Sequence, residues 1–202
     1  MNTASIDFIY EKLHETGFNI CTDTRKTVKD SFFICLSGDV FDGNIFAQKA
    51  LDLEAKYVVT NNSSIFSDRI LLVENPNETL AELAKIHSGK LKPKTQFISI
   101  GGSNGKTTTK ELLTAIFQEQ YVTKATKGNL NNHIGVPLTL LSFDENTDFG
   151  IVELGTNHPG EMAFLCDLFL PDAGLITNIG KEHLEGFGSI EAVAKEESEL
   201  YL

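Results

Sequence analysis

The chain has 202 residues, of which 41% are hydrophobic and 22% charged, a composition typical of one or two globular domains and not of a disordered protein. Its 17 basic and 28 acidic residues give a formal net charge of −11, which argues against binding to duplex nucleic acid but not against binding small anions through backbone N–H groups. Three widely spaced cysteines, no signal-like N-terminus and no long apolar run predict a soluble, cytoplasmic protein with reduced thiols and no insertion into a membrane.

The first part of the chain is predicted to form a small α/β unit. Apolar residues at helical spacing and capping signals predict helices over 6–13, 45–53 (with Asn44 as N-cap) and 77–87. Short apolar runs predict strands over 31–36, 56–60 and 69–73. The basic segment Lys90–Lys94, which proline interrupts, is interpreted as a domain boundary that divides the chain into 1–92 and 93–202.

After this boundary, strand patterns alternate with helix patterns. The predicted strands cover 95–100, 149–154 and 173–179, and the predicted helices cover 107–118, 160–169 and 189 onward. Such alternation is typical of a parallel, doubly wound sheet, whose ligands bind beyond the C-terminal ends of the strands. Because the chain stops inside the last helical pattern without a cap, we expect it to be a piece of a longer protein.

A glycine-rich segment follows the first strand of the second part. Residues 101–109 read Gly-Gly-Ser-Asn-Gly-Lys-Thr-Thr-Thr, in the strand–loop–helix order of a P-loop. Lys106 would reach the β- and γ-phosphates of a nucleotide, and Thr107 would offer its hydroxyl to Mg²⁺. The strict spacing fails, because Ile100 stands where the first glycine is expected and Gly101 gives a tighter loop. The context nevertheless favours nucleotide binding over a glycine-rich turn with a surface lysine.

Two further polar residues follow later strands. Glu153 ends the apolar strand 149–154, and a carboxylate beside a P-loop indicates a Mg²⁺ ligand, the alternative being an exposed acid at a strand end. His183 follows the next strand at the same predicted edge, and on the residues alone a structural and a functional role both stay open.

Together these motifs resemble the Mur ligases. Residues 101–109 are similar to the ATP loop of that family, and residues 129–137 to its substrate-phosphate loop. Residues 153–162 and 183–189 look like those of the member that adds D-alanyl-D-alanine, because sister enzymes typically carry Ser-Ser where this chain has Gly155-Thr156. Residues 22–25 and 41–44 resemble the uridine-binding domain.

The resemblance implies an ATP-dependent amide ligase of peptidoglycan precursor synthesis with three domains. This chain would hold the UDP-substrate domain (1–92) and the first part of a parallel-sheet P-loop ATPase domain (93–202), and by itself would not ligate. In the implied reaction, the terminal carboxylate of UDP-muramoyl-tripeptide would attack the γ-phosphate of ATP, and the amine of D-Ala-D-Ala would then displace phosphate from the acyl phosphate. These small molecules would be the partners of a monomer, with ATP and Mg²⁺ as cofactors. The alternatives are another Mur-type ligase, such as the one adding the third peptide residue or a folylpolyglutamate synthase, and a non-catalytic nucleotide-binding module.

The resemblance also implies residue roles. It implies ATP binding by Gly102, Ser103, Asn104, Gly105, Lys106, Thr107 and Thr108. The implied Mg²⁺ ligands are Thr107, Glu153 and His183, and the implied catalytic residues are Lys106, Glu153, His183 and Glu197. The implied substrate-binding residues are Thr24, Arg25, Asp42, Asn131, Asn132, Asn157 and His158.

Glu197 is a departure from the family pattern. Related ligases carry a lysine at this position, and its carbamate, formed with CO₂, helps to bind a second Mg²⁺. Alignment on Glu199-Leu200-Tyr201 places Glu197 there, whereas Lys195 lies roughly 200° away around the helix. Our hypothesis is that Glu197 supplies the carboxylate directly, without CO₂. The alternative is that Glu197 is a solvated acid and that Lys195 is the modified residue.

Overall fold

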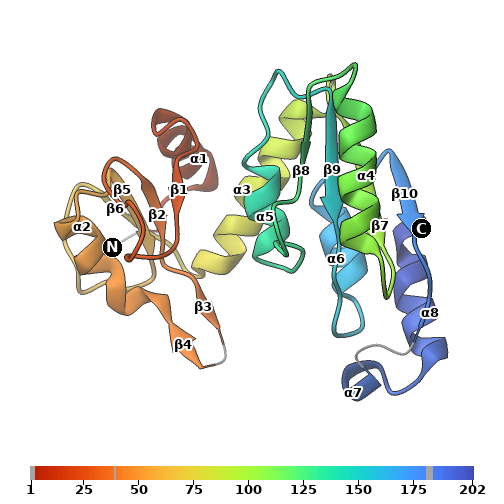
Figure 1. Cartoon of the computed structure of the whole chain (residues 1–202). Coiled ribbons are helices and arrows are strands. Elements are labelled where there is room, and N and C mark those ends of the chain that lie inside the picture. Colours follow the sequence, from red (N-terminus) through yellow and green to blue (C-terminus); the bar gives the residue numbers. More distant parts are fainter. Residues whose placement is uncertain (1–2, 39, 181–183) are drawn as a thin grey trace. The chain divides into compact units, whose positions relative to one another are not determined.

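The computed structural model describes residues 3–38, 40–180 and 184–202 and divides into two compact units, Met1–Leu83 and Ala84–Leu202 (Figure 1). The division falls inside helix α3 (Pro76–Leu91), earlier in the chain than the boundary expected from the basic segment. Each unit contains a four-stranded parallel sheet, so the predicted α/β fold class is confirmed. Within the described part of the chain, no helix has the length and apolar character that crossing a bilayer requires.

The sheet of the first unit has the strand order β1-β2-β5-β6, with all neighbours parallel. Its strands are β1 (Ile20–Cys21), β2 (Phe32–Ile34), β5 (Tyr57–Thr60) and β6 (Ile70–Leu72). Helix α1 (Ile6–Glu15) begins after Ser5, whose hydroxyl accepts a hydrogen bond from the backbone of Phe8, and it buries Ile9, Tyr10 and Leu13. The strands predicted at 31–36, 56–60 and 69–73 are present with shorter bounds.

The residues around Asp42 form a hairpin and a 3-10 turn, where the sequence predicts only the start of a helix. A hairpin of β3 (Ser37–Gly38) and β4 (Phe41–Asp42) leads into a 3-10 turn, η1 (Gly43–Phe46), and then into α2 (Ala47–Asp52). The prediction of Asn44 as N-cap is wrong, because Asp42 caps the turn by accepting from the Asn44 N–H at 2.9 Å. Asn44 is instead buried, and its side-chain oxygen accepts from the Thr60 hydroxyl at 2.8 Å and from the backbone N–H of Asn61 at 3.0 Å.

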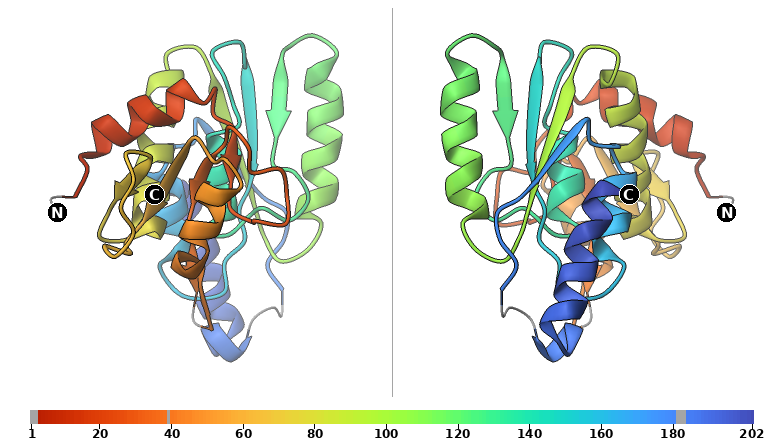
Figure 2. Two further views of the ribbon diagram at one scale, coloured as in Figure 1. Left: turned by 90° about the vertical axis from the view of Figure 1, so that its left-hand side faces the viewer. Right: turned by 90° about the vertical axis from the view of Figure 1, so that its right-hand side faces the viewer.

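The sheet of the second unit has the order β10-β7-β9-β8, again with all neighbours parallel. Its strands are β7 (Gln96–Gly101), β8 (Thr123–Ala125), β9 (Phe149–Glu153) and β10 (Ala173–Ile176). Figure 2 shows α4 (Lys106–Gln118) on one face of this sheet, and α6 (Glu161–Asp167) and α8 (Ile190–Ser198) on the other. The remaining helical segments are α5 (Gly135–Leu140), α7 (Leu184–Phe187) and η2 (Glu199–Tyr201).

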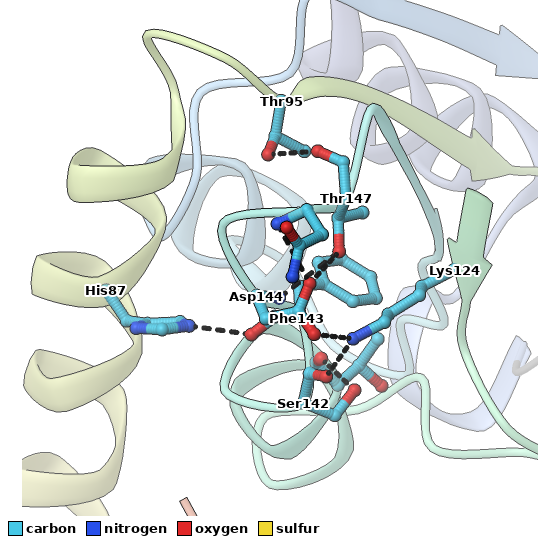
Figure 3. A network of polar contacts seen from close by, with 9 residues as sticks. His87, Thr95, Lys124, Ser142, Phe143, Asp144 and Thr147 are labelled. Carbon is cyan, nitrogen blue, oxygen red and sulfur yellow. Dashed lines mark hydrogen bonds and ion pairs between the residues drawn. The ribbon is translucent and has the colours of Figure 1, made fainter. Parts of the chain in front are cut away.

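A network of polar contacts holds the segment that connects α5 to β9 (Figure 3). The ring of His87, on α3, lies 3.0 Å from the carbonyl oxygen of Phe143, and the hydroxyl of Thr95 donates to the carbonyl of Thr147 at 2.7 Å. Lys124, on β8, forms an ion pair of 2.8 Å with Asp144. The C-terminal half of α3 thus contributes to the second unit, which explains why the division falls before the basic segment.

The packing of β9 generates a stability prediction. A Cβ atom at Gly150 would lie 2.7 Å from a ring carbon of Phe143 and 2.9 Å from one of Phe97. Because overpacking a filled core is destabilising, Gly150→Ala should lower the free energy of unfolding by about 1–3 kcal/mol. Gly89→Ala is the matched control, since nothing lies within 4 Å of a Cβ there and Ala is favoured in a helix. Denaturant titration compares the two variants, and equal effects would contradict the prediction.

Candidate functional site

The phosphate-loop candidate connects β7 to α4 at the C-terminal edge of the second sheet. Gly102 has φ +109°, and a Cβ there would lie 2.4 Å from the Thr177 hydroxyl, so that only glycine fits. The Lys106 ammonium folds back over the loop and donates to the carbonyl of Gly102. The backbone N–H groups of Ser103 and Asn104 donate to Asn178 at 2.9 and 3.1 Å. The segment after β10 therefore holds this loop from one side.

These contacts modify how the loop can bind an anion. The N–H groups of Gly102, Ser103 and Asn104 already donate to oxygens of the chain itself. The first turn of α4, however, contains N–H groups that have no partner within the helix, and the helix dipole favours negative charge there. Thr107 and Thr108 lie in that turn and are exposed. An anion bound at this loop would therefore be held by the start of α4 together with Lys106.

Glu153 ends β9 next to this loop and is buried, with 2% of its surface exposed. Its carboxylate oxygen Oε1 accepts from the Asn131 amide at 2.8 Å, and its backbone N–H donates to the Thr126 hydroxyl at 3.0 Å. The other oxygen, Oε2, has no hydrogen-bond partner within the described part of the chain. A buried, unsatisfied carboxylate oxygen is costly, and it is the kind of ligand that Mg²⁺ accepts. The strand-end acid is therefore not exposed, contrary to the alternative interpretation.

Lys110 is a residue that the sequence reasoning missed. Its side chain is fully buried on α4, with the ammonium 3.0 Å from Glu111 Oε1 and 3.8 Å from Glu153 Oε2. A buried lysine requires nearby negative charge, and Glu153 provides part of it. The available signal was its position one helical turn after Lys106, since residues four apart share a face of a helix.

Asn131 and Asn132, which the resemblance places at the substrate, behave differently. Asn131 lies against Glu153, and a Cβ at Gly155 would come within 2.9 Å of its amide group. Asn132 is exposed, and its side-chain oxygen accepts from the N–H groups of Ile134 and Gly135 at 3.2 and 2.9 Å, near the start of α5. Asn131 therefore belongs to the buried part of the site, while Asn132 orders the loop before α5.

The segment Gly155–Gly160 carries Asn157 and His158 at the same edge of the sheet. The Glu161 carboxylate accepts from the backbone N–H groups of both residues, at 2.5 and 3.1 Å. The His158 side chain is 71% exposed, with its Nδ1 atom 3.4 Å from Glu161. The backbone of this segment is thus fixed, while its polar side chains lie where a ligand could reach them.

Glu197, on α8, lies next to the phosphate-loop candidate. It is 2% exposed, and its Oε2 atom accepts from the Gly102 N–H at 2.7 Å, whereas Lys195 is exposed. The reading of Glu197 as a solvated helix acid is therefore wrong. His183, the other implied ligand on this side, lies outside the described residues.

Two of the three implied substrate residues of the first unit line a separate cavity of about 580 Å³. Thr24 and Arg25 line it, together with Lys26, Lys49 and the stacked rings of Phe41 and Phe46, which are 5.8 Å apart. The Arg25 guanidinium holds the pKa of Asp23 well below its usual range by hydrogen bonding to its carboxylate. Asp42 acts through its cap on η1 and is not among the lining residues.

Cys35 also lines this cavity and is buried. Burial raises the pKa of its thiol to about 12, so the thiol stays protonated at neutral pH. A protonated thiol is a poor nucleophile, so Cys35 contributes to this cavity by packing.

The side chains that could coordinate a metal decide whether the second unit can hold a divalent cation. Among the described residues, no three His, Cys, Asp or Glu side chains form a ready-made metal cluster. The unsatisfied Oε2 atom of Glu153 nevertheless fits one coordination position. Mg²⁺ commonly takes one or two protein carboxylates and completes its shell with water and substrate phosphates. The residues present therefore fit a Mg²⁺ ion that is bound together with a nucleotide.

Comparisons with known proteins agree with this geometry. The family model of the Mur ligase middle domain matches residues 100–202. A UDP-N-acetylmuramoyl-tripeptide--D-alanyl-D-alanine ligase from Bacillus subtilis is 39% identical over 184 residues, which cover 90% of this chain and 40% of the relative. The crystal structure of MurF from Acinetobacter baumannii matches 95% of this chain and 45% of that one, with a TM-score of 0.86 and 28% identity.

A further match is the MurF ligase from Thermotoga maritima in complex with ADP, with a TM-score of 0.82, 31% identity and coverage of 90% of this chain and 42% of that one. The chain spans about 40% of the length of the curated relatives it matches.

The contact between residues 131 and 155 gives a prediction. In Gly155→Ala the new methyl group must displace the Asn131 amide, and the hydrogen bond to Glu153 is lost, so the free energy of unfolding should fall by about 1–3 kcal/mol. The side-chain amide resonances of Asn131 in a ¹⁵N-correlation spectrum should then shift as they do in Glu153→Gln. Unchanged Asn131 resonances in Gly155→Ala would contradict this account.

Proposed function

The chain belongs to the Mur ligase family, and from this we propose that the protein carrying it joins D-alanyl-D-alanine to a UDP-muramoyl-tripeptide at the expense of ATP. The observation that carries the proposal is the meeting of a phosphate loop with Glu153, a buried carboxylate with an unsatisfied oxygen, at one sheet edge. The relatives in Bacillus subtilis and Haemophilus influenzae are named for this reaction. The ADP bound in the Thermotoga maritima ligase supports the use of a nucleotide.

The proposed reaction brings two anions together, so its main requirement is neutralisation and positioning of charge. Lys106 and the start of α4 would hold the β- and γ-phosphates of ATP, with Gly102–Gly105 shaping the loop around them. Glu153, with Thr107 and His183, would hold Mg²⁺, which when bound supplies positive charge to the transferring phosphoryl group. Lys110 would hold Glu153 from behind through an ion pair of 3.8 Å.

We assign the UDP end of the substrate to the cavity of the first unit. Arg25, Lys26 and Lys49 provide positive charge for a diphosphate, and the rings of Phe41 and Phe46 provide an apolar surface for a base. Asn131, Asn157 and His158 would contact the muramoyl peptide at the sheet edge of the second unit, with Asn132 ordering the adjacent loop.

Another Mur-type ligase and a non-catalytic nucleotide module are distinguished by one assay. We expect the full-length protein to release phosphate from ATP with UDP-muramoyl-tripeptide and D-Ala-D-Ala, and not with UDP-muramoyl-dipeptide and diaminopimelate or lysine, nor with a folate and glutamate. Lys106→Ala should reduce kcat/KM at least about a hundredfold, because a cation at the transferring phosphate is lost. Lys94→Ala, an exposed lysine before the opposite end of β7, is the charge-matched control and should be neutral. Turnover with another acceptor would support a sister ligase, and ATP binding without turnover would support a module.

We further propose that Glu197 takes the place of the carbamylated lysine of related ligases. Its burial beside Gly102 and the exposure of Lys195 support this assignment. The full-length enzyme should therefore show the same activity in bicarbonate-free and bicarbonate-supplemented buffer. Glu197→Gln should lose at least about tenfold in kcat, because a neutral amide oxygen binds a hard cation more weakly than a carboxylate does, while Lys195→Ala should retain activity. Loss of activity in Lys195→Ala together with retention in Glu197→Gln would refute the proposal.

A further inference from the structure

Glu196 is a buried carboxylate that the proposed chemistry does not use. It lies on α8 with 5% of its surface exposed, and its two oxygens accept from the backbone N–H groups of Gly160 at 2.8 Å and Met162 at 2.7 Å. Those groups belong to the start of α6, more than thirty positions earlier in the chain. The N-cap residue of α6 is Gly160, which has no side chain with which to cap it. Glu196 thus performs this capping from a distance.

The capped N-terminus is also the end of the segment that carries Asn157 and His158. Glu161 holds the middle of that segment through the N–H groups of these two residues, and Glu196 holds its end at Gly160. The next residue of α8, Glu197, accepts from the Gly102 N–H in the phosphate-loop candidate. Consecutive residues of one helical turn therefore bind two different loops of the same site.

Burying a carboxylate costs desolvation free energy, which capping a helix alone does not require. A local Ser, Asp or Asn cap at position 160 would accept from the Met162 N–H without removing a charge from water, but it would leave the N–H of position 160 itself unpaired and would have to adopt φ +89°. A distant carboxylate does something that a local cap cannot, since it fixes the segment relative to α8 and so relative to the phosphate loop. Charge-assisted hydrogen bonds at 2.7–2.8 Å are strong enough for this purpose.

We propose that Glu196 is a positioning residue that sets Gly155–Gly160, and with it Asn157 and His158, for the muramoyl peptide. This inference rests on the proposed ligase function. It concerns binding of the muramoyl peptide and not of the nucleotide, because the hydrogen bonds of Glu196 end at Gly160 and Met162, while Glu197 accepts from the phosphate loop.

The test uses steady-state kinetics of the full-length protein. Glu196→Gln keeps the size of the side chain but replaces one acceptor oxygen with a donor that faces an N–H group. We expect KM for UDP-muramoyl-tripeptide to rise about tenfold while KM for ATP changes less than twofold. Glu191→Gln, an exposed residue on the same helix, is the matched control and should leave both constants unchanged. A variant that raises both KM values equally, lowers only kcat or changes nothing would overturn the proposal.

A second measurement does not depend on turnover. Amide hydrogen exchange of the full-length protein should become faster in Glu196→Gln at residues 157–162 and stay unchanged at residues 102–105. Unchanged exchange in 157–162 would overturn the positioning role. If the wild-type protein fails to use D-Ala-D-Ala, the proposed function fails, while the exchange data still decide whether Glu196 orders this segment.

Discussion

The parallel pairing of β7 with a neighbour on each side is the constraint on which the candidate site depends. Ile100 is in register with Glu153 on β9, and Gly101 with Ile176 on β10. Because the three strands run in the same direction and end at the same level, the loops that follow them meet at one edge. Backbone hydrogen bonds between the strands are sufficient to bring together the glycine-rich loop, the end of β9 and the segment after β10.

This register also explains which parts of the site the sequence could predict. The alternation of apolar strands with helices predicts that Gly101–Thr109, Glu153 and the segment after β10 share an edge, and the structure confirms that shared edge for the described residues. Lys110 and Glu196 could not be singled out in the same way. Their positions follow from tertiary packing of α4 and α8, and a single sequence contains no signal of which acid on a helix becomes buried.

The elements that the prediction missed share a physical cause. Strands β1 and β8 have two and three residues, and α5 has six, so none is long enough to display a hydrophobic period. Asn44 illustrates a different limit. Its local sequence is that of a helix cap, but hydrogen bonds to Thr60 and Asn61 from another strand outweigh the local preference. The predicted domain boundary differs for a similar reason, since His87 and Ser88 of α3 bind residues far along the chain.

The second unit buries several carboxylates, which a single sequence does not predict. Glu153, Glu196 and Glu197 are each at most 5% exposed, in a chain whose net charge is already −11. Backbone N–H groups, rather than lysine or arginine alone, stabilise two of these carboxylates, at Gly102 and at the start of α6. Backbone donors cannot rotate away, so the carboxylates they bind are held in fixed positions. Glu153 differs because one of its oxygens has no such donor within the described chain. Glu196, whose two oxygens both accept from the backbone, therefore bears on architecture, and the unsatisfied oxygen of Glu153 marks the place where a ligand of positive charge would complete the site.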